Sequence, residues 1–542
     1  MGHARHPVQR SDPETVPGRL QAVAAEHGSL VALDDGRSAL TYAELLEAAG
    51  RIGAALTEMV AFGDRVAIWA PNSTEWACAS LGVLFAGATV VPVNTRYTAA
   101  EMGDIVGRAG CRVVFAEHEF LGRTLVDEVR SSGLEMPVVG LGPGHSDRRC
   151  TSWSDLLAAG RSGPTAARRL ARLSPSDISH VQYTSGTTGR PKGAMLRHSA
   201  VVRTTAEWAA IVGLGPGDRY PVIAPFSHIG GHKTGLLACL AVGATAVPFA
   251  TLDVDRLAGL IEAGGATILQ GPPTMYQALI GRFRATPSAS TPVAAAPSAS
   301  ARPRVAVTGG ASVAPSLVRD IVEVLGVEHV FTAYGLTEST GVCTMTAPTD
   351  EVATVAETSG RPIPGVQVRI VDDRGGPVPL GVRGQIVVGG DGVMAGYLDD
   401  PEATADAVRD GWLQTGDIGW IGEDGCLRIV DRSKDLVIVG GLNAYPAEIE
   451  RVLLEHPEVH QAAVIGVPDD RLGEVPVAFV VARAGRSIRG AELEEFCSRR
   501  LANFKRPRRY FLVPDLPVNA AGKVLKADLR QAAGSVDPAA GA

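Results

Sequence analysis

The sequence predicts an α/β protein built from parallel sheets covered by helices, followed by a smaller unit. Short β-branched runs alternate with Ala- and Leu-rich helical stretches through most of the 542 residues, an order typical of parallel sheets. From about Pro362 to Val430 the rhythm changes to short strands between Gly, Asp and Pro turns, which indicates a small β-barrel or antiparallel sheet. The β-branched runs are Arg65–Ala70, Thr89–Pro92, Arg112–Phe115, Ala244–Pro248, Thr267–Leu269 and Arg304–Thr308.

The chain is longer than the roughly 250–300 residues at which a single core usually divides into domains. We expect a large N-terminal domain at residues 1–431, with two parallel-sheet α/β subdomains and a β-rich subdomain at 345–431. A small mobile α+β C-terminal domain is expected at 432–542. The Ala-, Ser-, Pro- and Thr-rich stretch at 285–303 cannot bury much apolar surface, so it predicts a surface loop.

Composition narrows the setting in which the protein works. A net charge of −7 without charged blocks gives no support to nucleic acid as a partner. The 7 cysteines are scattered without a CxxC pair, which favours a reducing cytoplasm and no structural zinc. The most apolar stretch, Val66–Val93, is interrupted by Pro71 and Glu75, so we expect no integral membrane segment. Monomer and homodimer both stay open.

A loop rich in glycine and hydroxyl groups, residues 183–193, carries the strongest chemical signal. It reads Tyr-Thr-Ser-Gly-Thr-Thr-Gly-Arg-Pro-Lys-Gly and follows the apolar strand Ile178–Tyr183. Closely spaced glycines let backbone N–H groups converge on a phosphate, and Lys192 adds a positive charge. Because Lys192 precedes Gly193, this is not a Walker A loop. A flexible linker is the alternative, and the agreement of the motifs described next argues against it.

Four further motifs follow in order, and with them the sequence resembles the adenylate-forming superfamily from roughly Leu40 to Arg530. That superfamily includes acyl-CoA synthetases, peptide-synthetase adenylation domains and firefly-type luciferases. The motifs are Ala333-Tyr334-Gly335-Leu336-Thr337-Glu338, Thr415-Gly416-Asp417, Asp431-Arg432-Ser433-Lys434-Asp435 and Asn519-Ala520-Ala521-Gly522-Lys523.

The resemblance implies a role for each motif. Tyr334 would pack on adenine, Thr337 would hold the α-phosphate, and Asp417 would bind both ribose hydroxyls. Lys523 would swing into the site to neutralise charge as the acid attacks the α-phosphorus, with Lys434 at the hinge. The implied catalytic residues are Lys523, Thr187, Glu338 and Lys192, with Glu338 and Thr187 also binding Mg²⁺. The implied nucleotide and coenzyme A residues are Thr184, Ser185, Gly186, Thr188, Gly189, Gly310, Ala311, Tyr334, Gly335, Thr337, Asp417, Arg432, Lys434, Gly440 and Gly441.

The implied reaction uses ATP to convert a carboxylic acid to its acyl-AMP, releases pyrophosphate and transfers the acyl group to coenzyme A. Gly440 and Gly441 would line the pantetheine tunnel, where side chains would block passage. An enzyme that adenylates nitrite, a stand-alone adenylation domain and an inactive scaffold are the alternatives. Intact Lys192, Glu338, Asp417 and Lys523 argue against the scaffold.

The strings Val91-Pro92-Val93-Asn94-Thr95-Arg96-Tyr97 and Gly271-Pro272-Pro273-Thr274-Met275-Tyr276 resemble actinobacterial acyl-CoA synthetases, among them ligases for the indanedione propanoate left by steroid-ring degradation. The resemblance implies that Pro225-Phe226-Ser227-His228-Ile229-Gly230-Gly231-His232-Lys233 forms the floor of the acid pocket, and here the sequence departs from the usual pattern. The predicted acid-pocket residues are His228, Gly231, Lys233 and Gly309. Ser227 stands at a commonly aromatic position, which favours a small polar acid over a long alkyl chain. Two positions are open for Lys233: its ammonium lies in water at a helix start, with His232 exposed, or it faces the pocket and pairs with a polar group of the substrate.

Overall fold

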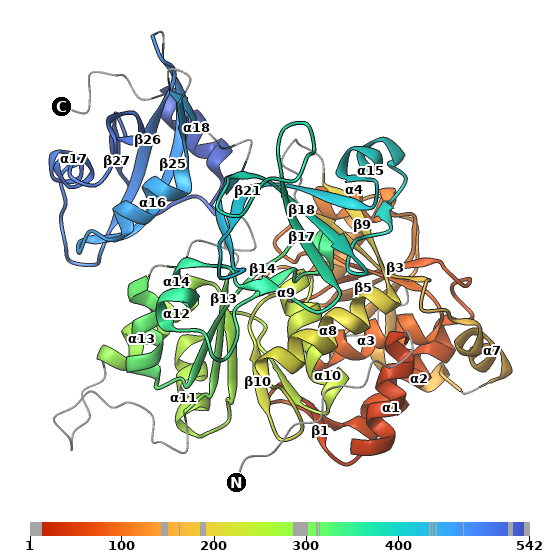
Figure 1. The fold of residues 1–542 in the computed structure, drawn as a ribbon. Coiled ribbons are helices and arrows are strands. Elements are labelled where there is room, and N and C mark those ends of the chain that lie inside the picture. Colours follow the sequence, from red (N-terminus) through yellow and green to blue (C-terminus); the bar gives the residue numbers. More distant parts are fainter. Residues whose placement is uncertain are drawn as a thin grey trace, which may run out of the picture.

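The structure, a computed structural model, describes residues 14–142, 150–161, 163–184, 191–285, 302–309, 313, 315–432, 435, 437–439, 442–469, 471–518 and 524–535. Within these ranges the strands form five sheets, and helices cover them (Figure 1). The predicted α/β fold class is confirmed.

The largest sheet has eight strands in the order β19-β9-β8-β4-β3-β5-β6-β7. Strands β8, β4, β3, β5, β6 and β7 are parallel, and β9 and β19 run antiparallel to their neighbours. The bounds are β3 (Arg65–Trp69), β4 (Thr89–Pro92), β5 (Cys111–Glu117), β6 (Val138–Leu141), β7 (Thr151–Ser152), β8 (Ile178–Thr184), β9 (Lys192–Arg197) and β19 (Gly396–Tyr397).

Two smaller sheets, each parallel except at one edge, complete the α/β part. One has the order β10-β11-β1-β2 and the other β12-β13-β14-β15-β16. Their strands are β1 (Val31–Asp34), β2 (Ala39–Thr41), β10 (Arg219–Val222), β11 (Thr245–Pro248), β12 (Ile268–Gly271), β13 (Val305–Gly309), β14 (His329–Tyr334), β15 (Thr344–Met345) and β16 (Arg361–Pro362).

The β-rich segment forms an antiparallel sheet of five strands, β17-β18-β21-β20 with β22 paired to β21. The strand bounds are β17 (Val366–Val371), β18 (Gly384–Gly390), β20 (Val408–Arg409), β21 (Trp412–Ile421) and β22 (Leu427–Arg432).

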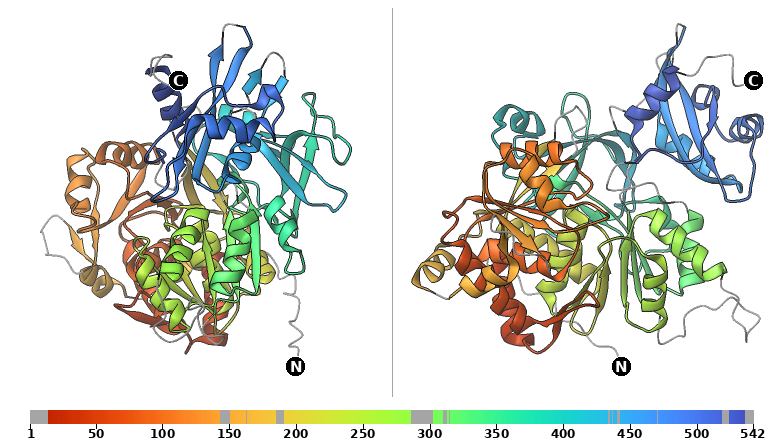
Figure 2. Two further views of the ribbon diagram at one scale, coloured as in Figure 1. Left: turned by 90° about the vertical axis from the view of Figure 1, so that its left-hand side faces the viewer. Right: turned by 180° about the vertical axis from the view of Figure 1, so that it is seen from behind.

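A separate lobe follows, with the sheet β24-β23-β26-β25 and β27 paired to β26 (Figure 2). The strand bounds are β23 (Val437–Val439), β24 (Leu442–Ala444), β25 (Val459–Asp469), β26 (Gly473–Ala482) and β27 (Tyr510–Leu512). The buried side chains of this lobe form two cores, which draw only on residues from Val437 to Ala533. The lobe therefore buries its own apolar residues, as an independent domain does; a boundary at 431/432 stays a prediction.

The helices of the large α/β part and the β-rich unit are α1 (Val16–His27), α2 (Tyr42–Leu56), α3 (Thr74–Phe85), α4 (Ala99–Arg108), α5 (Leu125–Ser131), α6 (Trp153–Ala159), α7 (Pro164–Arg172), α8 (His198–Val212), α9 (Ile229–Gly231), η1 (His232–Leu237), α10 (Ala238–Val242), α11 (Val254–Glu262), α12 (Pro273–Ala285), α13 (Pro315–Leu325), η2 (Thr337–Ser339), α14 (Val352–Glu357) and α15 (Pro401–Ala407). The helices of the C-terminal lobe are α16 (Pro446–Leu454), α17 (Gly490–Ser498), η4 (Asn503–Lys505) and α18 (Lys526–Ser535).

Successive residues of the parallel strands enter two different cores. In β3, Val66 and Ile68 join the main core with α2 and α3, whereas Ala67 and Trp69 join a second core with α4 and α5. Successive side chains of a strand point to opposite faces, and a parallel sheet is covered on both faces, so a continuous apolar run is required. This burial explains why these strands lack alternation of polar and apolar residues.

In the described ranges, no helix combines the length and apolar character needed to cross a bilayer. Of the Ala/Ser/Pro/Thr-rich loop predicted at 285–303, residues 286–301 lie outside the described part of the chain.

Candidate active site

The segments that carry the predicted site follow the carboxyl ends of strands β8, β10, β13 and β14. Ligands of open α/β sheets bind in the crevice outside these ends. The Gly-rich loop links β8 to β9, and Thr184 pairs in register with Lys192, so the two ends of the loop lie side by side. Residues Ser185, Gly186, Thr187, Thr188 and Gly189 lie outside the described residues.

Glu338, in η2, meets the phosphate loop and a residue that the sequence reasoning did not select. Its Oε1 lies 3.4 Å from Thr184 Oγ1 and accepts a hydrogen bond of 2.9 Å from the Tyr397 hydroxyl. Burial and the Glu338 charge raise the pKa of Tyr397, so the phenol stays a donor. Lys192 Nζ lies 5.4 Å from the centre of the Tyr397 ring. The two-residue strand β19 gave no sequence signal for Tyr397, because its place is fixed only by pairing with β9.

Tyr334 and Asp417 lie together, as the resemblance implies for residues that share one nucleotide. The Tyr334 hydroxyl donates to Asp417 Oδ2 at 2.6 Å. Burial and the Asp417 charge raise the pKa of the Tyr334 phenol. In the β21–β22 ladder Asp417 is opposite Arg432, so the two backbone positions lie side by side. The Arg432 side chain, Lys434, Gly310 and Ala311 lie outside the described part.

Glycines allow close packing of the backbone in this region. A Cβ on Gly335 would lie 2.3 Å from the Gly341 carbonyl oxygen, and one on Gly309 would lie 2.7 Å from the Ala333 carbonyl oxygen. Such contacts are too short for any side chain, so these positions require glycine. Thr337 lies in the next turn, partly exposed, between Gly335 and Glu338.

The predicted acid segment leaves β10 and enters α9. His228 caps α9, and its Nδ1 accepts from the Gly230 N–H at 3.2 Å. The His228 side chain is exposed, and desolvation by the surrounding chain lowers its pKa. A Cβ on Gly231 would lie 2.2 Å from the carbonyl oxygens of Ala224 and Pro225, so this turn also requires glycine.

His232 and Lys233 are both 0% exposed, so the expectation that His232 is exposed and the Lys233 ammonium lies in water is wrong. Lys233 Nζ lies 3.1 Å from His232 Nδ1. The His232 ring packs edge-on against the rings of His180 and Trp76, with centroids 4.7 and 4.8 Å apart. Both side chains belong to η1, whose six residues are all buried. A pocket role for Lys233 stays a prediction.

Burial lowers the pKa of each base in this cluster. Desolvation lowers the pKa values of Lys233 and His232, and the nearby Lys233 adds to the effect on His232. His180 and His198 are also 0% exposed; burial, with Lys233 second, lowers the pKa of His198 to about 3. The four side chains therefore form a buried basic cluster.

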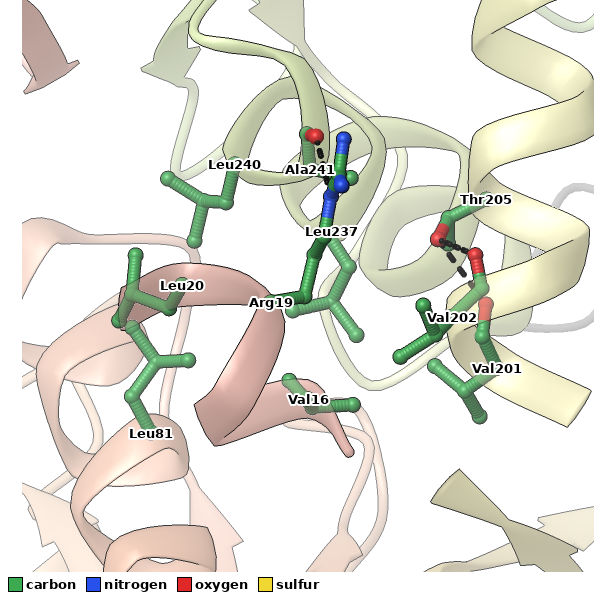
Figure 3. Close-up of a pocket in the computed structure, with 10 residues that line it drawn as sticks. All are labelled: Val16, Arg19, Leu20, Leu81, Val201, Val202, Thr205, Leu237, Leu240 and Ala241. Atoms are coloured by element: carbon green, nitrogen blue, oxygen red, sulfur yellow. Dashed lines mark hydrogen bonds between the residues drawn. The ribbon is translucent and has the colours of Figure 1, made fainter. Parts of the chain in front are cut away.

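A separate apolar pocket lies between α1, α3, α8, η1 and α10 (Figure 3). Arg19 crosses it and donates from Nε to the Ala241 carbonyl oxygen at 2.8 Å, and the Thr205 hydroxyl donates back to its own helix. None of the predicted site residues lines it, and its polar atoms already have partners. It is a gap in helix packing. Lining residues are Val16, Arg19, Leu20, Leu81, Val201, Val202, Thr205, Leu237, Leu240 and Ala241.

The remaining predicted residues, Gly440, Gly441 and Lys523, lie outside the described residues. What the structure does place together is a phosphate-loop strand, a carboxylate beside it, a Tyr–Asp pair and a glycine-lined segment after β10. With three α/β sheets, a β-rich sheet and a C-terminal lobe, this arrangement defines an adenylate-forming enzyme.

Comparison with known proteins agrees. Residues 20–398 match the AMP-binding enzyme family and residues 448–523 match the AMP-binding enzyme C-terminal domain. The chain belongs to the AMP-binding enzyme family.

Its relatives include 3-[(3aS,4S,7aS)-7a-methyl-1,5-dioxo-octahydro-1H-inden-4-yl]propanoyl:CoA ligases. That of Mycobacterium tuberculosis is 44% identical over 533 residues, covering 96% of this chain and 99% of the relative. That of Rhodococcus jostii is 41% identical over 529 residues, covering 96% and 99%. The ATP-bound structure of MatB from Rhodopseudomonas palustris superposes with a TM-score of 0.84 at 30% identity, covering 96% and 99%. These findings confirm the predicted class, an AMP-forming acid–CoA ligase, and none of them favours nitrite adenylation or a stand-alone adenylation domain.

Proposed function

We propose that this chain is the CoA ligase of a bicyclic dioxo acid, a propanoate carried on a methyl-octahydroindene-1,5-dione. The observation that carries the proposal is the 44% identity to a ligase of that acid over nearly both chains. The reaction forms the acyl-AMP from the acid and ATP, releases pyrophosphate, and then exchanges AMP for the CoA thiol.

Polar groups at the floor of the acid segment support a substrate that carries carbonyl oxygens. Gly230 and Thr234 lie one helical turn apart, and the Thr234 hydroxyl donates to the Gly230 carbonyl oxygen at 2.8 Å. Gln270, at the end of β12, donates from Nε2 to Thr234 Oγ1 at 2.9 Å, and its Oε1 accepts from the Tyr220 hydroxyl. An amide nitrogen has two N–H groups. Within the described residues only one is used, so the other can donate to a ring carbonyl.

In this proposal the acid needs no general base, because a carboxylic acid is ionised near pH 7. His228 accepts at Nδ1, so its neutral ring carries the proton on Nε2 and can donate to a carboxylate oxygen. Lys192 and Lys523 would offset the charge that develops on the phosphates. Catalysis then depends on positioning and fixed charge.

Glu338 would hold Mg²⁺ together with the nucleotide phosphates, with Thr187 as a second oxygen ligand. A carboxylate oxygen is the ligand type that Mg²⁺ prefers, and the ion usually keeps only one or two carboxylates beside phosphates. The bound ion would neutralise charge on the departing pyrophosphate. Asp417 and Arg432 would bind the ribose, and Tyr334 would pack on adenine while its hydroxyl stays on Asp417.

Because all 7 cysteines are free, we assign the enzyme to the cytoplasm.

The test is a panel of acids assayed for pyrophosphate release with and without CoA. The dioxo acid should give the highest kcat/KM for pyrophosphate release. When CoA is supplied, the CoA ester of this acid should form. The panel also contains a long-chain fatty acid, an aryl acid, a dicarboxylic acid and nitrite. Higher kcat/KM for the fatty or aryl acid would refute the assignment of substrate, and pyrophosphate release without any CoA ester would refute CoA as the acceptor.

A further inference from the structure

The backbone of the acid segment is held by two buried side-chain amides from distant parts of the chain. The first is Asn72, 5% exposed, between β3 and α3. Its Nδ2 donates to the carbonyl oxygens of Val222 and Ala224 at 3.1 and 2.9 Å, and its Oδ1 accepts from the Phe226 N–H at 2.6 Å. These partners fix which side of the amide is nitrogen, because an oxygen there would face two carbonyls.

The second amide is Gln182, 2% exposed, on β8. Its Nε2 donates to the Ser227 carbonyl oxygen at 2.5 Å. Because side chains alternate along a strand, Gln182 shares a face of β8 with Thr184, which meets Glu338. One strand face therefore touches both the acid segment and the residue predicted to bind Mg²⁺.

The two amides bind adjacent residues, Phe226 and Ser227. Next in the chain, the His228 N–H donates to the Pro225 carbonyl oxygen at 2.8 Å. The turn that presents the His228 ring is therefore fixed at three consecutive residues. Segments outside helices and strands depend on such bonds to side chains for a single conformation.

We infer that Asn72 and Gln182 are positioning residues that clamp the acid segment and hold His228 at the reacting carboxylate. The inference rests on the proposed function, which puts the acid beside His228. Among the described residues, the hydrogen bonds of both amides go to the segment from Val222 to Ser227, so we expect that removing either amide displaces the acid and leaves ATP binding in place. A misplacement of about 1 Å at a reacting group can reduce the rate on the order of 100-fold.

The variants are Asn72→Ala, Gln182→Met and Gln182→Glu, assayed for pyrophosphate release with acid and ATP varied separately. Gln182→Met keeps the length of the side chain but has no donor group. Gln182→Glu keeps the shape of the side chain and cannot donate to the Ser227 carbonyl oxygen when its carboxyl is ionised. We expect kcat/KM for the acid to fall about tenfold to 100-fold, with the KM for ATP changed less than about twofold.

The matched control is Thr245→Val, which removes another buried hydrogen bond, from Thr245 Oγ1 to the Val31 carbonyl oxygen at 2.6 Å, away from the acid segment. Thermal melts of all variants measure the general loss of stability. The clamp is refuted if the variants lower kcat/KM for the acid no more than Thr245→Val does, or if the KM for ATP rises in parallel. If the wild type does not use the dioxo acid, the proposed substrate fails, and the same comparison is made with whichever acid of the panel it does use.

Discussion

Lys233 gives a prediction about stability that depends on its neighbours. The side chain is fully buried, its Nζ contacts His232, and burial lowers its pKa well below the usual value of 10.5. The other titratable groups that act on the cluster, His180 and His198, are also bases. We therefore expect Lys233 to lose its proton at a lower pH in the folded protein than in the unfolded chain.

The direction of the pH dependence follows from the number of protons that the folded and unfolded states bind. Between the lowered folded pKa and the unfolded value near 10.5, the unfolded chain binds one more proton, so stability rises with pH by about 1.4 kcal/mol per unit. Lys233→Met keeps a long apolar side chain and removes this proton. Between the folded pKa and 10.5 the wild type should therefore gain stability over the variant as the pH rises, by up to about 1.4 kcal/mol per unit.

Urea unfolding measures the difference, followed by tryptophan fluorescence, because Trp76 packs against His232 in the same cluster. Groups that titrate equally in both proteins cancel when the two pH profiles are subtracted. Parallel profiles would refute a lowered pKa of Lys233. Kinetics of the same variant test its predicted pocket role: a loss of specificity confined to polar acids supports that role, and unchanged selectivity contradicts it.

Three further predictions concern the reaction. Lys523→Ala should abolish adenylate formation yet leave thioester formation from supplied acyl-AMP nearly intact; equal loss of both steps, measured separately, would contradict alternation of the small domain. Gly441→Leu should leave pyrophosphate release unchanged and block CoA ester formation, since a side chain would fill the tunnel; normal ester formation would remove Gly441 from that passage. Gln270→Leu should lower kcat/KM for the dioxo acid about tenfold, or roughly 1.4 kcal/mol, the size of one hydrogen bond, while a ring analogue without carbonyls is unaffected; equal losses for both acids would mean a packing defect.

Much of the fold could be predicted from the sequence because local patterns determine it. The strand expected at Thr89–Pro92 is β4, and the run expected at Ala244–Pro248 contains β11. The antiparallel character of the β-rich segment followed from its turn residues, which set the chain direction locally. The order of strands within the sheets could not be predicted, since pairings such as β1 with β11 join residues about 200 positions apart.

Candidate site residues could be selected from the sequence where the chemistry needs a recognisable residue type, as with Glu338 and Asp417, and their roles stay predictions. Asn72, Gln182 and Tyr397 were not predicted, because their contacts are made only by the tertiary fold. An Asn before a helix is usually a turn or cap residue. The burial of Lys233 could not be predicted for a related reason. The residue lies in a buried π-helix, and such a helix has no distinct sequence pattern.

Strand β19 has a consequence for how the protein is made. It pairs with β9 through Gly396 and Met195, so the edge of the largest sheet is completed by residues translated about 200 positions later. At roughly 5–20 residues per second, a ribosome needs about 10–40 s to supply them. During that interval β9 is an open edge able to pair with other chains. Nascent chains that stop before residue 396 should therefore depend on chaperones, and an N-terminal fragment ending there should aggregate where one that includes Tyr397 stays in solution.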